Sequence, residues 1–573
     1  MVDLAKITQP LSLDRFGPRR TGPLVLELDL TEGVADEAPG DPIGQLFNRR
    51  RQHYLDVVEG IRRGARDPEV AALLVRVDTR SLGFAKVQEL RACVADFRST
   101  GRPAVAWADS FGETGDGNLP YYLACAFSEV AMAPTGLLGL TGLMIKSTFV
   151  KGALDRLGLD YEVGKRHEYK NALNGVTETG FTDAHREATD RIVTSLGDQI
   201  VEGIAQARPL SEERVRALVS QGPFLASEAL EHGLVDRLAY RDEIYSDLLA
   251  RVRGDADAEP RLQFVSRYHR KHTPAQRPRP VGDADHIALI TATGTISLGR
   301  TRRSPLGGGT VMGSDTVAAA FRAARRDPHV KAVVFRVDSR GGSPTASDAI
   351  RRESQLTREA GIPVVTTMGD FAGSGGYYVT LGSDAIVAQP GTLTGSIGVI
   401  VGKPVLGPLL ERYGITSETV GTGEHAGMFG SDRAFTESEW ERVNALLDQV
   451  YDDFTAKVGA ARNMTRDEVH EVARGRVWTG RDARERGLVD ALGGLETAVR
   501  IAREKVGGRA LPLRPFPRQH PLDRLRQHES SEDPAAAQPQ SSLSAWGPLR
   551  HVAAVLGLPE GGPLTMPDPG RVR

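Results

Sequence analysis

Short apolar runs alternate with amphipathic segments along this chain, and the whole pattern occurs twice. The matched apolar runs of the two halves are 73–77 with 332–337, 104–107 with 364–367, and 129–133 with 385–388. Segments with helical spacing separate these runs. Short strands that alternate with helices are typical of an α/β fold with a parallel sheet. We therefore expect two α/β units of the same design.

The two halves also match residue by residue, which identifies the pattern as a duplication. RDPEVAALLVRVDTR at 66–80 corresponds to RDPHVKAVVFRVDSR at 326–340, an offset of 260 residues. Near the end of each unit, HGLVDRL at 232–238 corresponds to RGLVDAL at 486–492, an offset of 254 residues. The unit is much longer than a solenoid repeat of ~20–50 residues, so the sequence indicates a duplicated domain.

Shifts in composition divide the chain into five parts. They are an N-terminal segment at 1–23, a first repeat at 24–250, a linker at 251–284, a second repeat at 285–505 and a tail at 515–573. Pro, Arg and Asp are frequent in the linker. The tail has a Pro/Gln/Ser-rich stretch that we expect to be disordered, followed by a short apolar segment at 543–558. Docking against the protein body and lying at a membrane surface both suit that segment.

Charge and composition narrow the function. The 573 residues carry 72 Lys and Arg against 74 Asp and Glu, so no basic excess indicates nucleic-acid binding. The sequence has no signal-peptide pattern and no apolar run of membrane-spanning length, which predicts a cytoplasmic protein with at most loose membrane contact. We expect Cys93 and Cys125 to be buried free thiols, with one disulfide as the alternative. No metal-ligand or nucleotide motif occurs, so we expect no cofactor.

The most informative difference between the repeats lies in a glycine-rich turn. In the second repeat, Ser374 stands between Gly373 and Gly375, where an expected strand leads into a helix. In the first repeat, Asn118 takes the place of this serine. Glycines permit unusual backbone angles, and the amide N–H after the serine can face a developing oxyanion. Ser374 is therefore a candidate nucleophile, although a tight-packing turn has the same composition.

A second glycine element follows the preceding strand of the same repeat. Gly341 and Gly342 stand there, and Ser81 and Leu82 are their counterparts in the first repeat. A Gly-Gly turn at the carboxyl end of a strand can present another backbone N–H to the same oxyanion. The surrounding residues lack the spacing of a phosphate-binding loop.

A serine nucleophile needs a base. None of the 13 histidines lies in either glycine element, and the clearest candidate is Lys170, in VGKRHEYKNALN. Its counterpart in the second repeat is Ala426 or Gly427, so one repeat keeps a serine and the other a lysine. A lysine acts as a general base only where burial or neighbouring groups lower its pKa toward the working pH. Without such surroundings, Lys170 is a solvated surface residue.

At these residues the chain resembles the S49 serine peptidases, in the long duplicated form of bacterial signal peptide peptidase A, or protease IV. The likeness covers roughly residues 24–500. Its matching elements are 164–170, 338–343, 372–377 and 390–398. The chain departs from the family pattern at Arg340, where the family usually has proline, and directly after Lys170.

The resemblance implies a fold, a site and partners. Each repeat takes a Clp protease/crotonase-like α/β fold, and a Ser/Lys dyad spans the two. Carried over to this sequence, Ser374 is the nucleophile and Lys170 the general base. Gly342 and Gly375 supply the oxyanion amides, and Ser396 orients the lysine amine. Members of the family cleave signal peptides released from the membrane and assemble as homo-oligomers.

The sequence therefore predicts a serine endopeptidase that uses a Ser/Lys dyad on signal peptides or other unfolded apolar peptides. Its expected partners are these peptides and further copies of the chain. Two alternatives are a catalytically inactive scaffold of the same fold and a crotonase-type acyl-CoA enzyme, since that fold shares the oxyanion geometry. We expect one nucleophilic centre per chain, because Asn118 has neither a hydroxyl nor a thiol.

Overall fold

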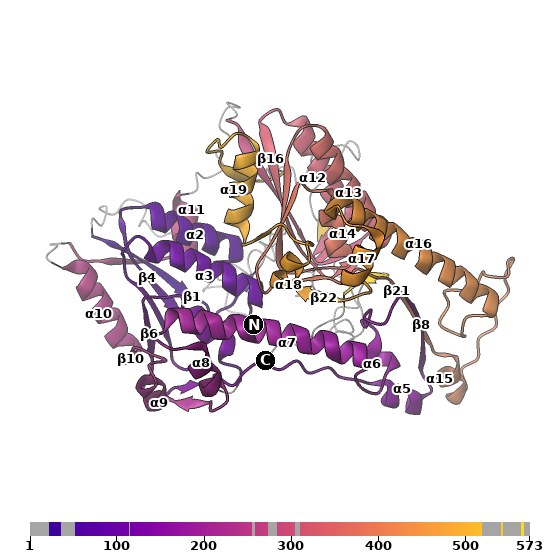
Figure 1. The fold of residues 1–573 in the computed structure, drawn as a ribbon, viewed down its shortest axis with the longest axis horizontal. Helices are drawn as coiled ribbons and strands as arrows, with labels where there is room; N and C mark the ends of the chain where they lie inside the picture. Colours follow the sequence, from indigo (N-terminus) through magenta and orange to yellow (C-terminus); the bar gives the residue numbers. More distant parts are fainter. Residues whose placement is uncertain are drawn as a thin grey trace, which may run out of the picture.

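The computed structural model describes residues 22–35, 52–113, 115–254, 258–272, 284–303, 310–517, 540–541 and 563–566. These residues form two α/β units, and the long helix α7 (Asp183–Ala207) runs along both of them (Figure 1). Helix α7 packs on α4 in the first unit and on β22 in the second. The apolar segment expected at 543–558 and nearly all of 1–23 lie outside the described residues.

The first repeat is built on a parallel sheet with the strand order β10-β6-β5-β4-β1-β11. Its strands are β1 (Leu24–Asp29), β4 (Val70–Arg76), β5 (Ala104–Ala108), β6 (Glu129–Met132), β10 (Arg237–Leu238) and β11 (Arg261–Phe264). Its helices are α2 (Tyr54–Arg66), α3 (Phe84–Arg98), α4 (Asn118–Ala124), α8 (Glu212–Val219), α9 (Ala226–Glu231), α10 (Arg241–Arg253) and α11 (Val265–His272). Strand β4 is buried along most of its length, as is usual in a parallel sheet covered on both faces.

The second repeat contains the same strand order, β23-β19-β18-β16-β12-β24. Its strands are β12 (His286–Thr293), β16 (Val330–Ser339), β18 (Val364–Gly373), β19 (Ala385–Ala388), β20 (Leu393–Gly395), β22 (Val477–Thr479), β23 (Ala491–Leu492) and β24 (Leu513–Pro515). Strands β20 and β22 continue the sheet beyond β18, and β22 is antiparallel to β20. The strand-for-strand match confirms two tandem α/β repeats.

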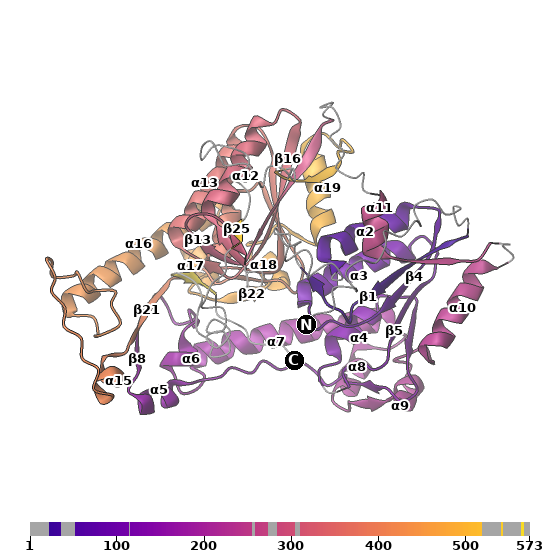
Figure 2. The same ribbon diagram turned by 180° about the vertical axis from the view of Figure 1, so that it is seen from behind.

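Helices cover both faces of the second sheet. The helices of the second repeat are α12 (Ser314–Arg326), α13 (Pro344–Glu359), α14 (Gly375–Tyr378), η3 (Val379–Gly382), α16 (Glu437–Arg462), α17 (Arg466–Val472), α18 (Gly480–Glu485) and α19 (Leu495–Lys505). Helices α12 and α13 lie on one face and α19 on the other, and each face has its own apolar core (Figures 1 and 2). No helix in the described ranges is long and apolar enough to cross a lipid bilayer.

The linker prediction is wrong for part of its range. Residues 261–264 form β11, which pairs in parallel with β1, and 265–272 form α11, which packs on α2. The buried Tyr268 donates its hydroxyl to the Asp67 carboxylate at 2.6 Å. Strand β24 holds the equivalent edge position in the second repeat. The composition of this segment predicted a linker and not a strand, because an edge strand needs few apolar residues and can be rich in charged ones.

An antiparallel ribbon joins the repeats. Strand β8 (Asp160–Lys165) of the first repeat pairs with β21 (Ile400–Val405) of the second over six residues. The helices near this ribbon are α5 (Lys151–Leu157), α6 (Asn174–Thr177) and α15 (Gly407–Arg412). The remaining strands are short: β2 (Val34–Ala35), β3 (Gln52–His53), β7 (Leu137–Leu138), β9 (Phe224–Leu225), β13 (Thr295–Ser297), β14 (Arg302–Arg303), β15 (Thr310–Gly313), β17 (Gly341–Gly342), β25 (Gln540–Ser541) and β26 (Leu564–Thr565).

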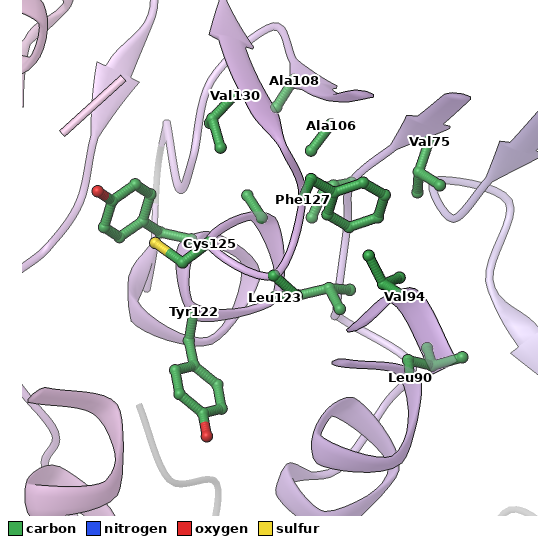
Figure 3. Packing of buried hydrophobic residues seen from close by; sticks show 14 of the residues in the cluster. Val75, Leu90, Val94, Ala106, Ala108, Tyr122, Leu123, Cys125, Phe127 and Val130 are labelled. Atoms are coloured by element: carbon green, nitrogen blue, oxygen red, sulfur yellow. The ribbon is translucent and has the colours of Figure 1, made fainter. Parts of the chain in front are cut away.

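The core of the first repeat encloses both cysteines. Figure 3 shows Cys125 beside Leu123 and Phe127 in this cluster, which also includes Cys93. Both are free and buried, which confirms the expectation of two free thiols. Burial raises the pKa of Cys93 to about 12 and also raises the pKa of Cys125. Both side chains are thus protonated at neutral pH and pack as small apolar groups.

Candidate active site

Ser374 lies in the turn between β18 and α14. Its backbone has φ 54° and ψ −116°, a conformation that side-chain-bearing residues rarely adopt. The N–H of Ser374 donates to the carbonyl of Gly395 at 2.7 Å, which ties the turn to β20. The whole residue is buried. This sharp, strained strand-to-helix turn fixes the direction of the hydroxyl, as a nucleophile requires.

Lys170 comes from the first repeat but lies in the second. Lys170 lies a few residues after β8. The N–H of Arg166 donates to the carbonyl of Val399 at 3.1 Å, so the segment between β8 and Lys170 is bonded to the second repeat. The Lys170 Nζ is 2.8 Å from the Ser374 Oγ. It is also 3.0 Å from both the carbonyl oxygen and the Oγ of Ser396. The structure thus brings together the serine and lysine that the sequence singled out, with Ser396 beside them.

Burial controls the charge of this amine. Lys170 is fully buried, and the loss of hydration lowers its pKa well below the usual value. A neutral amine has two N–H bonds and one lone pair. The two oxygens of Ser396 can accept the N–H bonds, which leaves the lone pair for the Ser374 hydroxyl. This arrangement is suited to proton abstraction.

Two glycines make room for the lysine. Gly475 has φ 89°, and a Cβ on it would lie 2.6 Å from the Lys170 Cα. A Cβ on Gly398 would lie 3.2 Å from the Lys170 Cδ. No sequence signal assigns this role to either residue, although Gly398 ends the matching element 390–398, because their proximity to Lys170 exists only once the repeats pack together. The Gly-Arg-Val sequence around Gly475 contains no other signal of this role.

The two glycine elements lie side by side. A Cβ on Gly375 would be 3.1 Å from the Gly342 backbone nitrogen, and one on Gly341 would be 2.7 Å from the Gly375 nitrogen. Gly341 and Gly342 have φ 102° and 156°, where a side chain is strained. Backbone amides from both elements are therefore adjacent to Ser374, as the sequence predicts for an oxyanion site.

A lysine of the first repeat supports both loops of this site. Lys86, on α3, forms ion pairs with Asp338 at 2.9 Å and with Asp370 at 3.2 Å. Asp338 lies near the end of the strand that leads to Gly342, and it also accepts the Phe371 N–H at 3.1 Å. Asp370 stands four residues before Ser374, and burial raises its pKa against the opposing effect of Lys86. No sequence pattern marks Lys86, although lysine is scarce in this arginine-rich chain.

A small cavity of about 30 Å³ lies next to the dyad. Its walls include Tyr169 and Asn171, the neighbours of Lys170, together with apolar side chains. Arg476 donates to the Tyr169 hydroxyl at 2.6 Å, and this hydroxyl donates in turn to the Glu187 carboxylate at 2.7 Å. His185 also lines the cavity, and burial lowers its pKa to about 4. The cavity is therefore uncharged on this side at neutral pH.

Asn118 occupies the equivalent turn of the first repeat and has other contacts. Its Oδ1 accepts the N–H groups of Thr141 at 3.1 Å and Gly142 at 3.0 Å. Its Nδ2 donates to the Gly142 carbonyl at 2.9 Å and to Asp116. These bonds close a local loop, so Asn118 has a structural role. Among the described residues, no cluster of three or more His, Cys, Asp or Glu side chains could hold a metal ion.

Comparison with known proteins identifies the family of the chain. The sequence pattern of peptidase family S49 matches residues 96–253 and 357–508, one match in each repeat. The chain is 32% identical over 450 residues to Serine protease SPPA, chloroplastic, of Arabidopsis thaliana, covering 78% of this chain and 65% of that protein. It is 31% identical over 474 residues to Protease 4 of Salmonella typhi, covering 80% and 73%. Protease 4 of Haemophilus influenzae is 27% identical over 476 residues, covering 80% and 74%.

Among solved structures, a point mutant of ClpP1 from Listeria monocytogenes aligns with 37% of this chain and 94% of its own, at 11% identity and a TM-score of 0.24. A point mutant of the 1510-N membrane-bound stomatin-specific protease aligns with 41% of this chain and 99% of its own, at 17% identity and a TM-score of 0.26. The matches in both repeats and the relatives that share most of the chain agree. This chain belongs to peptidase family S49 and is a serine peptidase.

Proposed function

We propose that the chain hydrolyses peptide bonds through a dyad in which Ser374 is the nucleophile and Lys170 the general base. The observation that carries this proposal is the 2.8 Å separation of the Lys170 Nζ and the Ser374 Oγ, with both residues fully buried. Burial lowers the pKa of Lys170, which increases the fraction of neutral amine that can accept a proton. Within the described part of the chain, no carboxylate contacts the amine to hold it in the charged form.

Acylation follows from this geometry. The Ser374 Oγ attacks the substrate carbonyl carbon as its proton moves to the Lys170 Nζ, and the carbonyl oxygen becomes an oxyanion. The amides of Gly342 and Gly375 donate to this oxyanion. The C–N bond then breaks, the leaving amine takes the proton from Lys170, and an acyl-Ser374 ester remains.

Deacylation reuses the same groups. A water molecule attacks the ester carbonyl while Lys170 accepts one of its protons. The oxyanion forms against the same two amides. The C–Oγ bond breaks, the serine oxygen recovers the proton from Lys170, and the carboxylic acid product leaves. Ser396 keeps the amine directed at Ser374 throughout, since it accepts both N–H bonds of the neutral form.

The substrates we propose are signal peptides or other unfolded apolar peptides. The uncharged cavity beside the dyad supports an apolar side chain there, because a charged one would lose hydration with no partner. A crotonase-type acyl-CoA activity is less consistent with a serine and a neutral lysine at the oxyanion site. The further copies of the chain expected as partners, the cytoplasmic location and the loose membrane contact stay predictions.

Active-site labelling tests the proposal. A fluorophosphonate probe should label the purified protein to about one group per chain, and peptide mapping should place the label on Ser374. Ser374→Ala should remove both labelling and peptide hydrolysis, and Lys170→Arg should not restore what Lys170→Ala loses, because a guanidinium stays protonated. Hydrolysis of unfolded apolar peptides that continues in Ser374→Ala would overturn the dyad, and a folded protein inert to probe and peptides would favour the scaffold.

A further inference from the structure

One helix contacts the elements on both sides of the dyad. Helix α16 packs against β8, whose chain continues to Lys170, and against η3, which directly follows the helix α14 that begins after Ser374. Figures 1 and 2 show α16 extending from the region of α14 and α17 out to β8 and β21. A Cβ on Gly164 of β8 would lie 2.8 Å from the Leu447 Cδ1, so the strand lies directly on the helix. Lys170 and Ser374 come from different repeats, yet the elements that hold them share this helix.

Arg166 joins the lysine segment to α16. It stands four residues before Lys170, directly after β8. Its Nε donates to the Asp448 carboxylate at 2.5 Å, and its Nη2 donates to the Asn444 carbonyl at 2.9 Å. Asn444 and Asp448 are one helical turn apart, so the planar guanidinium bonds to two successive turns of α16. This geometry fixes the direction in which the chain approaches the site.

Tyr378 joins the serine side to the same helix. It stands four residues after Ser374, and its N–H donates to the Ser374 carbonyl at 2.9 Å. The Tyr378 hydroxyl donates to Asp453 at 2.6 Å and accepts from Lys457 at 2.7 Å, and both partners belong to α16. Lys457 also donates to Asp348 of α13 at 2.9 Å. An ion-paired group thus holds α14, and with it the serine turn, against α16.

The first repeat lacks this ion-paired contact at the equivalent tyrosine. Tyr122 corresponds to Tyr378 and lies against α7, where a Cβ on Gly203 would be 2.3 Å from its Cε2. Its hydroxyl accepts from the Gln88 side chain at 3.5 Å, which is long for a hydrogen bond. The shared fold therefore does not require charged partners at this tyrosine, and the repeat with the serine has them.

We propose that α16 is the common support of the dyad, and that Arg166 and Tyr378 are positioning residues through which it sets the separation of the Lys170 Nζ and the Ser374 Oγ. The proposal rests on the peptidase function proposed above and adds residues that act without touching the reacting atoms. Proton transfer requires close approach, and a displacement of ~1 Å in a reacting group costs about 10²-fold in rate. Loss of one bonded contact to α16 should produce a fraction of this effect.

The two residues should act on different parameters. Burial is what lowers the pKa of Lys170, so releasing the Arg166 segment admits water and raises this pKa toward its usual value. Releasing Tyr378 instead moves the serine and leaves the surroundings of Lys170 as they are. A purely structural role of either residue would lower stability without this division.

His167 is the titrating group next to Arg166. Burial, His470, Arg474 and Arg166 itself lower its pKa below the usual ~6.5, against the opposing effect of Glu168. Loss of one neighbouring cation returns this pKa only part of the way to its usual value. The pH dependence above that range therefore reports Lys170 and not His167.

The first experiment removes the Arg166 guanidinium. Arg166→Met should lower kcat for a fluorogenic apolar peptide about tenfold at pH 7 with KM unchanged, and raise the midpoint of the pH profile of kcat/KM by about one unit. Arg166→Lys keeps a cation for Asp448 and should restore part of both. Circular dichroism establishes that each variant is folded, and Arg166→Lys gives the same test at smaller amplitude where Arg166→Met is unfolded.

Arg325→Met is the matched control for this experiment. The Arg325 side chain is 19% exposed, against 21% for Arg166, and it donates to the carboxylate and the backbone carbonyl of Glu353 on α13. It should therefore lose a comparable set of bonds without moving the midpoint. A folded Arg166→Met protein with the parent's midpoint, or an equal shift in Arg325→Met, overturns the proposal.

Asp448→Ala tests whether the effect of Arg166 passes through α16. Alone, this substitution should move the midpoint in the same direction as Arg166→Met. Added to Arg166→Met, it should have no further effect, because the bond between the two residues is already lost. Additive effects would mean that Arg166 acts by another route and would overturn its part in the proposal.

The second experiment removes the Tyr378 hydroxyl. Tyr378→Phe keeps the ring and leaves Lys457 and Asp453 paired with each other. It should lower kcat about tenfold without moving the midpoint of the pH profile. Tyr121→Phe is the control, because it also removes a buried hydroxyl, one that donates to the Leu234 carbonyl at 2.6 Å within the first repeat. A kcat of Tyr378→Phe within about twofold of the parent value overturns the role of Tyr378.

The third experiment does not depend on hydrolysis. The difference in free energy of unfolding between a protein and its Lys170→Met form rises with pH from the native pKa of Lys170 to the unfolded one. In proteins that carry Arg166→Met, this rise should begin at a higher pH, because the native pKa is higher. Urea unfolding over a series of pH values measures it, and the contribution of His167 cancels in each pair. The same onset with and without Arg166→Met overturns the proposal.

These experiments separate the failure of this inference from the failure of the proposed function. A shifted onset in a protein that never hydrolyses peptides would support α16 as the support of Lys170 and contradict the peptidase function. Ser374-dependent hydrolysis with kcat and midpoint unchanged in Arg166→Met and Tyr378→Phe would support the peptidase and contradict the common support.

Discussion

Asn118 and Ser374 occupy equivalent turns of the two repeats, but their side chains make different contacts. Both residues are almost completely buried at the start of a short helix beyond a central strand. Asn118 satisfies its hydrogen-bonding groups within its own repeat. The Ser374 hydroxyl instead meets an amine from the other repeat. The same scaffold therefore closes a loop in one copy, and in the other it holds the proposed nucleophile against the proposed base.

The lysine side of the site shows the reverse division. Lys170, in the first repeat, is fully buried against the second repeat, while its counterparts Ala426 and Gly427 are exposed. Each repeat thus contains one residue of the proposed dyad. A single copy of this sequence would hold only a buried serine without a base or a lysine without a buried environment. The duplication is what allows the pKa of Lys170 to be lowered, because the second repeat supplies its surroundings.

Exchanging the two turn residues for alanine should separate activity from stability. Ser374→Ala should lower kcat/KM at least about 10³-fold and leave the free energy of unfolding nearly unchanged. Asn118→Ala should keep activity within about twofold but lower the free energy of unfolding by about 1–3 kcal/mol, because buried loop amides lose their acceptor. Peptide hydrolysis and urea unfolding measure the two effects. Loss of activity in folded Asn118→Ala would show that the first repeat contributes to catalysis through residues other than Lys170 and the groups that position it.

A methyl group at Gly475 should displace Lys170 and lower activity without disturbing Ser374. Gly475→Ala places a Cβ against the Lys170 backbone, and a displaced amine should cost about 10²-fold in kcat, as a shift of ~1 Å in a reacting group does. Gly361→Ala is the matched control: its φ of 82° is close to the 89° of Gly475, but a Cβ there meets no atom within 4 Å. Both variants share the backbone strain, so only Gly475→Ala should lose activity. Equal activities would mean that Lys170 tolerates movement.

The sequence alone predicted what differs between the copies. Ser374 stood out because Asn118 replaces it, and Lys170 because Ala426 or Gly427 does; the repeated apolar runs predicted two parallel sheets. The supports of the site gave no such signal. Gly475 and Lys86 act on residues more than 200 positions away, and no local pattern encodes the packing of one repeat on the other. The edge strand β11 was mistaken for a linker for a related reason, since its partner β1 lies at the other end of the repeat.

Lys86 offers a finer test of how the repeats cooperate. We expect Lys86→Met to lower kcat about tenfold with little change in KM, since Asp338 and Asp370 would lose the cation that holds the two site loops together. Lys86→Arg should restore part of kcat by replacing the charge. Arg481→Met is the matched control, because Arg481 also bridges the repeats, to Glu202, away from both loops. A similar kcat loss in both Met variants would indicate a general loosening of the interface.

The smallest effect we predict is a pH-dependent stability difference that reports the charge of Lys170 directly. Burial lowers the pKa of Lys170 in the native state, while in the unfolded chain it returns to ~10.4. Between these two values the unfolded state binds one more proton than the native state, so raising the pH stabilises the native protein. Lys170→Met has no such proton. The free energy of unfolding of the parent protein should therefore rise relative to that of Lys170→Met by about 1.4 kcal/mol per pH unit.

Urea unfolding of the two proteins at pH 7, 8 and 9 measures this difference, and the effects of all other titrating groups cancel in the comparison. The difference should level off above the unfolded pKa, where both states have lost the proton, and below the native pKa, where both carry it. A difference that stays flat from pH 7 to 9 would mean that Lys170 is an ammonium in the folded protein over that range. Ser374 would then face a charged amine that can donate a hydrogen bond to its oxygen but cannot accept its proton. Lys170 could not act as the general base, and burial of this lysine of the first repeat in the second would not serve proton transfer.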